Sequence, residues 1–282
     1  MSTFTEFAMS HGVIISNIIA GERIYRCPTE SHPHSTNGAY FFDGQRGWIQ
    51  NWETGEPIQW WSGGESKPWT EQEKREWAER RQRSEAEKNA LRAKAAKTAQ
   101  AAISSATNDK HQYLQEKGHG DTLALVSKEG NMLVPMRDIE TNELLGVQSI
   151  FLEESRWQKK MTYGMRAKGA VFRLGQKHIT ETYLVEGYAT ALSVDAALRM
   201  LRLKADVVVC FSASNLVHVA SILSGRIFIF ADNDHSKTGE VSAQSTGLPY
   251  CMSDQVGEDA NDLFNRAGVM AVAKKIMEVR QA

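Results

Sequence analysis

The stretch YLVEGYATA, residues 183–191, decides the fold, because an apolar run ends abruptly in an acid and a glycine. A second apolar run, RIFIF at 226–230, leads into Asp232 and Asp234. A third acidic cluster follows at residues 258–262. In an open parallel sheet, ligands gather beyond the carboxyl ends of the strands, so acids that follow separate strands converge on one point. The sequence therefore predicts an acidic site at one edge of a parallel sheet.

Continuous apolar runs alternate with amphipathic segments around these acids. The runs predict strands at 182–185, 205–210, 227–231 and 248–251. The intervening segments predict helices at 188–202 and 215–223, a short helix after Gly239, and one closing helix over 264–279. This alternation indicates a parallel sheet covered by helices on both faces. The predicted fold class of this part is therefore α/β.

Converging carboxylates suit a hard divalent cation. Mg²⁺ prefers oxygen ligands and keeps several waters, which substrate phosphates displace. We expect Asp232, Asp234 and Glu186 to hold Mg²⁺ or Mn²⁺, with Glu186 also placed to move a proton. The alternative is that these acids are only polar strand ends. Two interpretations also stay open for Asp259 and Asp262, which either bind nucleotide and template or cap the helix that follows.

At these residues the chain resembles the Toprim family, the fold shared by bacterial-type primases, topoisomerases and some nucleases. The family pattern is a strand-end Glu-Gly followed by Asp-x-Asp, which Glu186-Gly187 and Asp232-x-Asp234 match. The form Glu-Gly-Tyr-Ala-Thr-Ala, with Asn-Asp-Leu at 261–263, looks most like primase domains carried by phages and plasmids. The resemblance implies that Glu186 acts in acid–base chemistry and that the two aspartates hold magnesium.

The segment before this part, residues 105–180, predicts short strands at 121–125, 130–137 and 144–151. It resembles the mixed α+β subdomain that precedes Toprim in primases. A basic cluster follows, and in that family such a segment carries basic residues that face template and nucleotide phosphates. The resemblance implies this role for Lys159, Lys160 and Lys168. Ordinary surface lysines are the alternative, because cations are common on exposed loops.

Residues 1–69 predict a small β-rich module. Runs at 39–42 and 47–52, separated by Asp43-Gly44, predict a hairpin. Five of the seven tryptophans lie in this module: Trp48, Trp52, Trp60, Trp61 and Trp69. One interpretation is that the module binds single-stranded template, with Trp48 and Trp52 stacking bases beside Arg23 and Arg26. The other is that the rings fill a small core.

The amino-terminal module holds one cysteine, Cys27, with His11, His32 and His34 near it in sequence. A structural zinc site pairs two cysteines closely with a second such pair of ligands, so we expect no zinc here. Residues 70–104 are rich in Glu, Lys, Arg, Ala and Gln without Gly or Pro, which predicts an exposed connecting helix.

The length and composition of the chain limit the classes of protein to which it can belong. The chain has 282 residues, 41% of them hydrophobic and 24% charged, which suffices for at least one sizeable core and two domains. The net charge of −1 means that nucleic acid must be bound by local basic patches. Three widely spaced cysteines indicate a reducing compartment, the cytoplasm. No signal peptide or membrane-spanning run is present, so we expect no membrane partner.

The resemblance implies a magnesium-dependent DNA primase-like nucleotidyltransferase, which makes short RNA primers on single-stranded DNA from nucleoside triphosphates. A Toprim nuclease that cleaves nucleic acid and a non-catalytic nucleic-acid-binding replication protein remain alternatives. The sequence lacks a GxxxxGK[ST] loop, so any helicase partner is a separate chain. The domains we expect are a template-binding module (1–69), a helical connector (70–104), a primase-type subdomain (105–180) and a Toprim domain (181–282).

Overall fold

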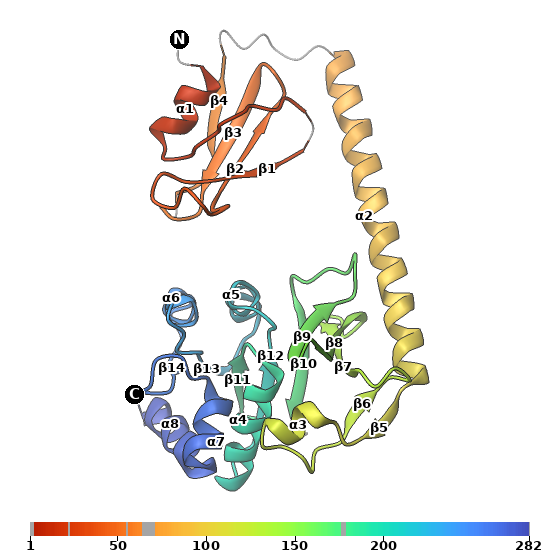
Figure 1. The fold of residues 1–282 in the computed structure, drawn as a ribbon, viewed down its shortest axis with the longest axis vertical. Coiled ribbons are helices and arrows are strands. Elements are labelled where there is room, and N and C mark those ends of the chain that lie inside the picture. Colours follow the sequence, from red (N-terminus) through yellow and green to blue (C-terminus); the bar gives the residue numbers. More distant parts are fainter. Residues whose placement is uncertain (1–2, 22, 55, 64–70, 176–178, 282) are drawn as a thin grey trace. The chain divides into compact units, whose positions relative to one another are not determined.

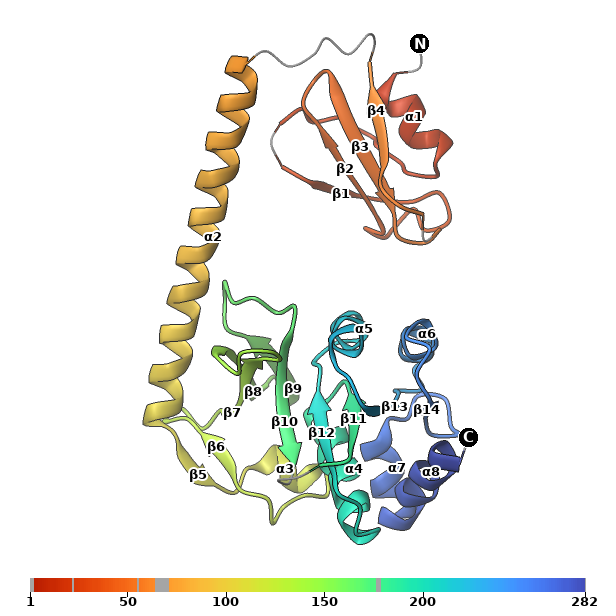
Figure 2. The ribbon, with the colours of Figure 1, turned by 180° about the vertical axis from the view of Figure 1, so that it is seen from behind.

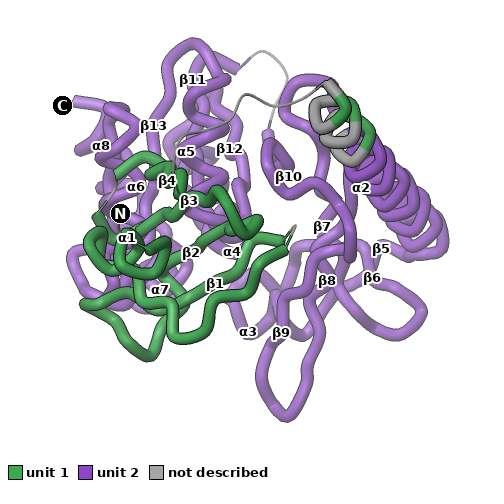
Figure 3. Tube along the Cα trace, turned by 90° about the horizontal axis from the view of Figure 1, so that it is seen from above, with its two compact units in different colours: residues 1–80 green, residues 81–282 purple. Residues whose placement is uncertain are grey.

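The computed structural model describes residues 3–21, 23–54, 56–63, 71–175 and 179–281, so Trp69 lies outside the described residues. The chain forms two compact units, residues 1–80 and 81–282 (Figure 3). The boundary between the units falls within the long helix α2 (Glu71–Ser105). None of the described helices has the length and apolar character needed to cross a membrane.

The amino-terminal unit is a four-stranded antiparallel sheet with one helix, α1 (Phe4–Ser10) (Figure 1). The strands pair in chain order: β1 (Tyr25–Cys27), β2 (Gly38–Phe42), β3 (Arg46–Asn51) and β4 (Gln59–Ser62). The predicted hairpin is confirmed, with Phe42 opposite Gly47 in the β2–β3 register. Its turn is held by Asp43, whose Oδ1 accepts the backbone N–H groups of Gln45 and Arg46.

One face of this sheet packs against α1 to form the core of the unit. Phe4 of α1 is buried and stacks on Phe42, with ring centroids 4.8 Å apart. Tyr40, Ile49 and Trp61 pack in the same cluster. Trp61 is therefore partly buried against this core, in line with one of the two interpretations of the tryptophans.

The second unit is built on a ten-stranded mixed sheet with the order β14-β13-β11-β12-β10-β7-β6-β5, while β8 pairs with β7 and β9. Its first half carries one short helix, α3 (Gln112–Glu116). The strands of that half are β5 (Thr107–Asp109), β6 (Ala124–Val126), β7 (Met132–Asp138), β8 (Leu144–Glu153), β9 (Arg156–Met161) and β10 (Ala170–Gly175).

The carboxyl-terminal half is the predicted parallel α/β part. Its strands β11 (Glu181–Val185), β12 (Ala205–Val209), β13 (Arg226–Phe230) and β14 (Tyr250–Cys251) run parallel in the order β14-β13-β11-β12. Their side chains alternate between two cores, because successive strand residues point to opposite faces. Helices α4 (Tyr188–Met200), α7 (Ala260–Ala267) and α8 (Val269–Gln281) cover one face, and α5 (Ala213–Ile222) and α6 (Thr238–Ser245) cover the other (Figures 1 and 2). The predicted fold class is confirmed.

Strand β10 joins the two halves of the sheet. Residues 172–175 pair antiparallel with β12, and Ala170 and Val171 pair antiparallel with β7. The mixed subdomain and the parallel part therefore share one continuous sheet, which places residues of α3, β8 and β9 beside the carboxyl ends of the parallel strands.

The single closing helix predicted over 264–279 was wrong. Gly268 ends α7 with φ +78°, a left-handed conformation that favours glycine, and α8 starts at the next residue. α7 also starts earlier than predicted, at Ala260 after the N-cap Asp259, so that the acidic cluster at 258–262 lies at the start of a helix.

Candidate active site

A polar cleft of about 200 Å³ lies beyond the carboxyl ends of β11 and β13. Both halves of the second unit contribute to it. Its walls carry three acids and two lysines among polar and aromatic side chains: Tyr113, Lys117, Gln148, Lys159, Glu186, Gly187, Ala189, Thr190, Phe211, Asp232 and Asp259. The sequence prediction that acids after separate strands converge is therefore confirmed for Glu186, Asp232 and Asp259.

Glu186 follows the last residue of β11 and precedes Gly187, the N-cap of α4. Burial raises the pKa of its carboxyl group, and the negative charge of Asp234 raises it further. The backbone N–H of Ala213, at the start of α5, hydrogen-bonds the carboxylate and works in the opposite direction. Glu186 therefore holds a proton more readily than an exposed glutamate, which is the direction that suits a group in acid–base chemistry.

Asp232 lies just beyond β13 and is the most perturbed acid of the cleft. Burial, followed by the charges of Asp259, Glu186 and Asp234, raises its pKa to about 8, while Lys159 lowers it. Its Oδ1 is buried and has no hydrogen-bond partner among the described residues. A buried, unpaired carboxylate oxygen is unfavourable, and a cation bound beside it would relieve that cost.

Asp234 is held by its own turn and does not line the cleft. Its Oδ1 accepts from the Ser236 hydroxyl and, at 3.3 Å, from the Thr238 N–H. Its Oδ2 accepts from the N–H of Gly239 at 3.1 Å, and these bonds keep its pKa low. The turn requires the glycine, because a Cβ at Gly239 would lie 2.3 Å from the Asp232 carbonyl oxygen.

Asp259 caps α7 and lines the cleft at the same time. Its Oδ1 accepts the N–H groups of Asn261 at 2.7 Å and Asp262 at 2.9 Å. Its Oδ2 accepts the hydroxyl of Thr190 at 3.0 Å. Asp262 completes the capping box and lies 3.9 Å from the Lys117 Nζ, outside the cleft lining. The capping role is therefore observed for both acids, and a binding role stays a prediction.

The three candidate lysines do not lie together. Lys159 lines the cleft. Lys160, next on β9, lies 3.7 Å from Glu153 and over the ring of Phe151, because neighbouring strand residues face opposite sides. Lys168 is exposed in the loop between β9 and β10 and does not line the cleft.

Lys117 is a cleft residue that the sequence reasoning missed. It follows α3, and its carbonyl oxygen accepts the side-chain amide of Asn261 at 2.8 Å. Asn261 is fully buried and also donates to the Ser193 hydroxyl at 3.0 Å, which ties the loop after α3 to α4 and α7. Nothing in the local sequence around Lys117 signals this approach, because the tie comes from residues far along the chain.

Thr190 and Phe211 were also missed. Thr190 lies four residues after Glu186, which on a helix start is one turn away, so the quoted stretch did carry a signal for it. Phe211 has φ +64°, a conformation rare for a bulky residue, and its N–H donates to the Glu186 carbonyl at 2.9 Å. Strained residues of this kind gather at functional sites.

The acidic side chains of the cleft can be compared with the ligands that Mg²⁺ prefers. Among the described residues, no three His, Cys, Asp or Glu side chains form a ready-made metal cluster. Mg²⁺ does not need one, because it is commonly held by one or two carboxylates together with waters and substrate phosphates. The unpartnered Oδ1 of Asp232, close enough to Glu186 for their charges to interact, fits such an ion.

The amino-terminal candidates belong to the other compact unit. The guanidinium carbon of Arg26 lies 3.9 Å from the centroid of the Trp52 ring, and Trp48 stacks on Phe41. Arg23 is exposed in the loop before β1. Cys27 is buried in the core of the unit, where burial raises the pKa of its thiol to about 11.

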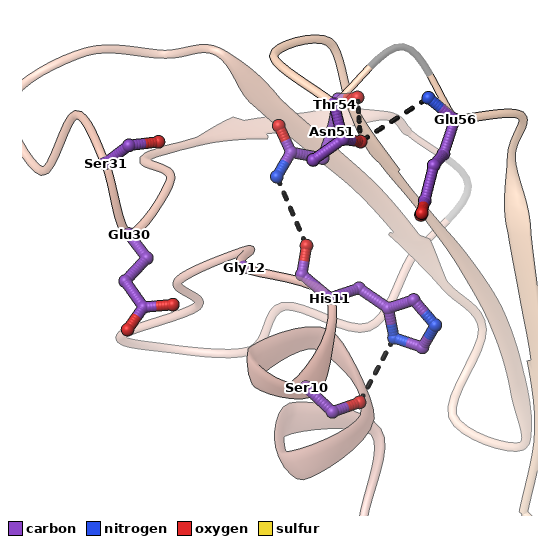
Figure 4. A pocket seen from close by; sticks show the side chains of 8 residues that line it. All are labelled: Ser10, His11, Gly12, Glu30, Ser31, Asn51, Thr54 and Glu56. Atoms are coloured by element: carbon purple, nitrogen blue, oxygen red, sulfur yellow. Dashed lines mark hydrogen bonds between the residues drawn. The ribbon is translucent and has the colours of Figure 1, made fainter.

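A second hollow, of about 480 Å³, opens in the amino-terminal unit (Figure 4). In Figure 4 the Asn51 amide points toward the carbonyl oxygen of His11, to which it donates at 3.2 Å. The hollow also contains Glu30 and Glu56, and none of the predicted site residues lines it.

Comparison with known proteins identifies the class of the carboxyl-terminal domain. Residues 181–275 match the family model of the Toprim domain, and this range runs from β11 into α8. The chain therefore carries a Toprim domain, a domain that generally binds Mg²⁺ through acidic residues. The resemblance drawn from Glu186-Gly187 and Asp232-x-Asp234 is confirmed to this extent.

No curated protein sequence matches the chain. Among solved structures, the chain is similar to one from a complex of the bacteriophage T7 lagging-strand DNA polymerase with primase domains of two gp4 subunits, bound to an RNA/DNA hybrid and dTTP. The sequence identity is 17% and the TM-score 0.41, over 63% of this chain and 92% of the other.

Proposed function

We propose that the protein is a magnesium-dependent, primase-like nucleotidyltransferase that makes short RNA primers on single-stranded DNA from nucleoside triphosphates. One observation carries the proposal: the Toprim cleft combines the unpartnered carboxylate of Asp232 and the buried Glu186 with two lysines from the preceding subdomain. Acids alone suit metal-assisted hydrolysis. Lys117 and Lys159 add cations at the position where a triphosphate would meet the acids.

Asp232 and Glu186 would hold Mg²⁺ or Mn²⁺, with Asp234 contributing its charge from the adjoining turn. When bound, the ion would neutralise phosphate charge and lower the pKa of the attacking hydroxyl. Glu186 takes up the proton of that hydroxyl, because burial makes its carboxylate a better base than an exposed one.

The lysines act on the substrate's charge. The carboxylates of Asp232 and Asp259 repel an incoming phosphate, and Lys117 and Lys159, which line the same cleft, offset that repulsion. Thr190 is oriented by its hydrogen bond to Asp259, so its own oxygen faces the same cleft. Lys160 and Lys168 would contact template phosphates outside the cleft.

The partners implied by this activity are single-stranded DNA, nucleoside triphosphates and a helicase carried by a separate chain. A phage- or plasmid-type primase of this kind would work in the cytoplasm, where its template lies. Zinc has no part in the proposed chemistry.

The test is incorporation of labelled nucleotides on single-stranded DNA, with Mg²⁺ and with a chelator, alongside a cleavage assay on end-labelled DNA. We expect magnesium-dependent products shorter than the template and no cleavage. Cleavage without incorporation would identify a Toprim nuclease, because the same acids can activate water. DNA binding without either reaction would identify a non-catalytic replication protein.

A further inference from the structure

The sheet of the amino-terminal unit has one covered face and one open face. Tyr25, Tyr40, Ile49 and Trp61 point to the side packed by α1. Since successive strand residues alternate, the intervening positions point away from that core. These positions form the open face: Arg26, Ala39, Phe41, Arg46, Trp48, Gln50, Trp60 and Ser62.

Three aromatic rings form a row across the open face. Trp60 of β4 is opposite Trp48 of β3, and Trp48 is opposite Phe41 of β2, in the strand register. The rings of Phe41 and Trp48 stack with centroids 6.4 Å apart and an interplanar angle of 20°. Trp60 is 72% exposed, which leaves one ring face at the end of the row free to stack on another flat group.

The strand positions of the open face include basic residues. In the described strands β1 to β4, its positions include Arg26 and Arg46 and no Asp or Glu, although acids outnumber bases in the whole chain. Arg26 lies over the ring of Trp52, itself 45% exposed, just after β3. Arginine and aromatic rings are thus interleaved on one side of a small sheet.

We propose that this open face binds single-stranded nucleic acid, with unpaired bases stacking on the row Phe41, Trp48 and Trp60 and with phosphates contacting Arg26. Every base presents a flat π face, so a row of rings binds without sequence preference, and a basic neighbour tracks the backbone. An apolar partner protein would have to bury the exposed guanidinium of Arg26 among these rings, whereas a polyanion complements its charge. The proposal does not depend on the chemistry of the Toprim cleft.

The experiment measures binding of the full chain to a fluorescent oligo-dT of about 12 nucleotides, within the site size of small sheet modules, by anisotropy. A chelator is present throughout, so metal-dependent chemistry in the cleft plays no part. We expect Trp60→Ala to weaken binding about tenfold, the loss of one stacked base. Because Trp60 is mostly exposed, its removal leaves the core of the unit in place.

The matched control is Tyr163→Ala, which removes an 87% exposed ring from the other unit and should leave binding unchanged. An abasic oligomer of the same length separates bases from phosphates. Wild type should bind it more weakly than oligo-dT, and Trp60→Ala should narrow that difference. Arg26→Ala should instead flatten the dependence of binding on salt.

Equal affinity of Trp60→Ala and wild type for oligo-dT would overturn the proposal, as would failure of wild type to distinguish oligo-dT from the abasic strand. No binding by wild type at low salt would overturn it too and would leave the open face to a protein partner. Oligo-rU of equal length shows whether DNA or RNA is the ligand, since both carry stackable bases. If the protein incorporates nucleotides but its open face does not bind oligo-dT, this inference alone is overturned and the proposed function stands.

Discussion

The Toprim cleft and the open face of the amino-terminal sheet, for which we propose binding of nucleotides and of single-stranded nucleic acid, differ in burial and in charge. The cleft gathers carboxylates in a partly buried place, where burial and mutual repulsion raise the pKa of Asp232 and Glu186. The open face has the exposed Trp60 and Arg26, the half-buried rings of Phe41 and Trp48, and no acid at its described strand positions. Buried charges suit chemistry, because low dielectric strengthens them. Exposed rings suit holding a strand that must move, because stacking is tolerant of sequence.

The substitution with the largest expected effect on the cleft alone is Glu186→Gln. If the cleft is the chemical site, Glu186→Gln should lower nucleotide incorporation by about 10²–10⁴-fold, the range for loss of a general base. Oligo-dT binding should not change, because the open face lies in the other unit. The control is Glu240→Gln, an acid on α6 that pairs with Gln244 and is outside the cleft lining. Wild-type incorporation by Glu186→Gln would remove its catalytic role.

The raised pKa of Asp232 should make the stability of the Toprim domain depend on pH. A pKa raised to about 8 means that, without metal, the folded chain binds a proton that the unfolded chain releases above about pH 4, so stability falls as pH rises from about 4 to 8. Asp232→Asn mimics the protonated form and should be more stable than wild type at pH 8, by on the order of 5 kcal/mol, and equally stable near pH 4. Thermal melts with a chelator measure this.

Magnesium should reverse that order. Added Mg²⁺ should raise the melting temperature of wild type at pH 8 and leave Asp232→Asn unchanged, because the variant lacks the charged oxygen ligand. Asp234→Asn should weaken magnesium affinity less, since both oxygens of Asp234 already accept hydrogen bonds from its turn. A variant Asp232→Asn that is stabilised by Mg²⁺ as strongly as wild type would contradict the metal assignment.

Two neighbouring tryptophans sharpen the distinction between the faces of the amino-terminal sheet. Trp61 packs in the core and Trp60 is exposed on the open face. Trp61→Ala should lower the free energy of unfolding of this unit by about 2 kcal/mol through lost burial, and Trp60→Ala by no more than about 0.5 kcal/mol. Urea denaturation followed by circular dichroism compares them. Equal losses would mean that the sheet has no open face.

The smallest expected effect separates two adjacent lysines. Lys159→Ala should raise the KM for nucleotide about tenfold, in line with loss of one charge-assisted contact, and leave kcat nearly unchanged. Lys160→Ala is the matched control, because it removes the same side chain from the opposite side of β9. Steady-state kinetics over nucleotide concentration gives both values. A similar KM for the two variants would move Lys159 out of the nucleotide site.

Sequence reasoning reached the acids of the cleft because their chemistry is local. Glu186 and Asp232 each follow an apolar strand, and parallel strands end at one edge. Sequence reasoning grouped Lys159 and Lys160 because it did not identify β9 as a strand. In a strand, neighbouring side chains point to opposite faces of the sheet. The sequence could not predict that Lys117 lines the cleft, since its position depends on a hydrogen bond from Asn261, which comes much later in the chain.

The amino-terminal unit shows the same limit in another form. Composition predicted a tryptophan-rich β module, and the turn at Asp43-Gly44 predicted its central hairpin. Assigning Trp61 to the core and Trp60 to the surface required the packing of α1, which no pattern in the strands encodes. Gly268, by contrast, was a visible helix terminator that the prediction of one closing helix overlooked.

The position of β10 between β7 and β12 has a consequence for how the protein is made. During translation β7 and β10 leave the ribosome before β12. The cleft is completed later still, because it needs both Tyr113 and Asp259, and Asp259 is synthesised after β12. A nascent chain halted after α6 lacks Asp259 and the two helices that cover α4. Such a chain exposes apolar surface and has an incomplete cleft, whereas its amino-terminal sheet, with a core of its own, is ready to fold much earlier. The amino-terminal unit can therefore fold while the Toprim domain is still being synthesised.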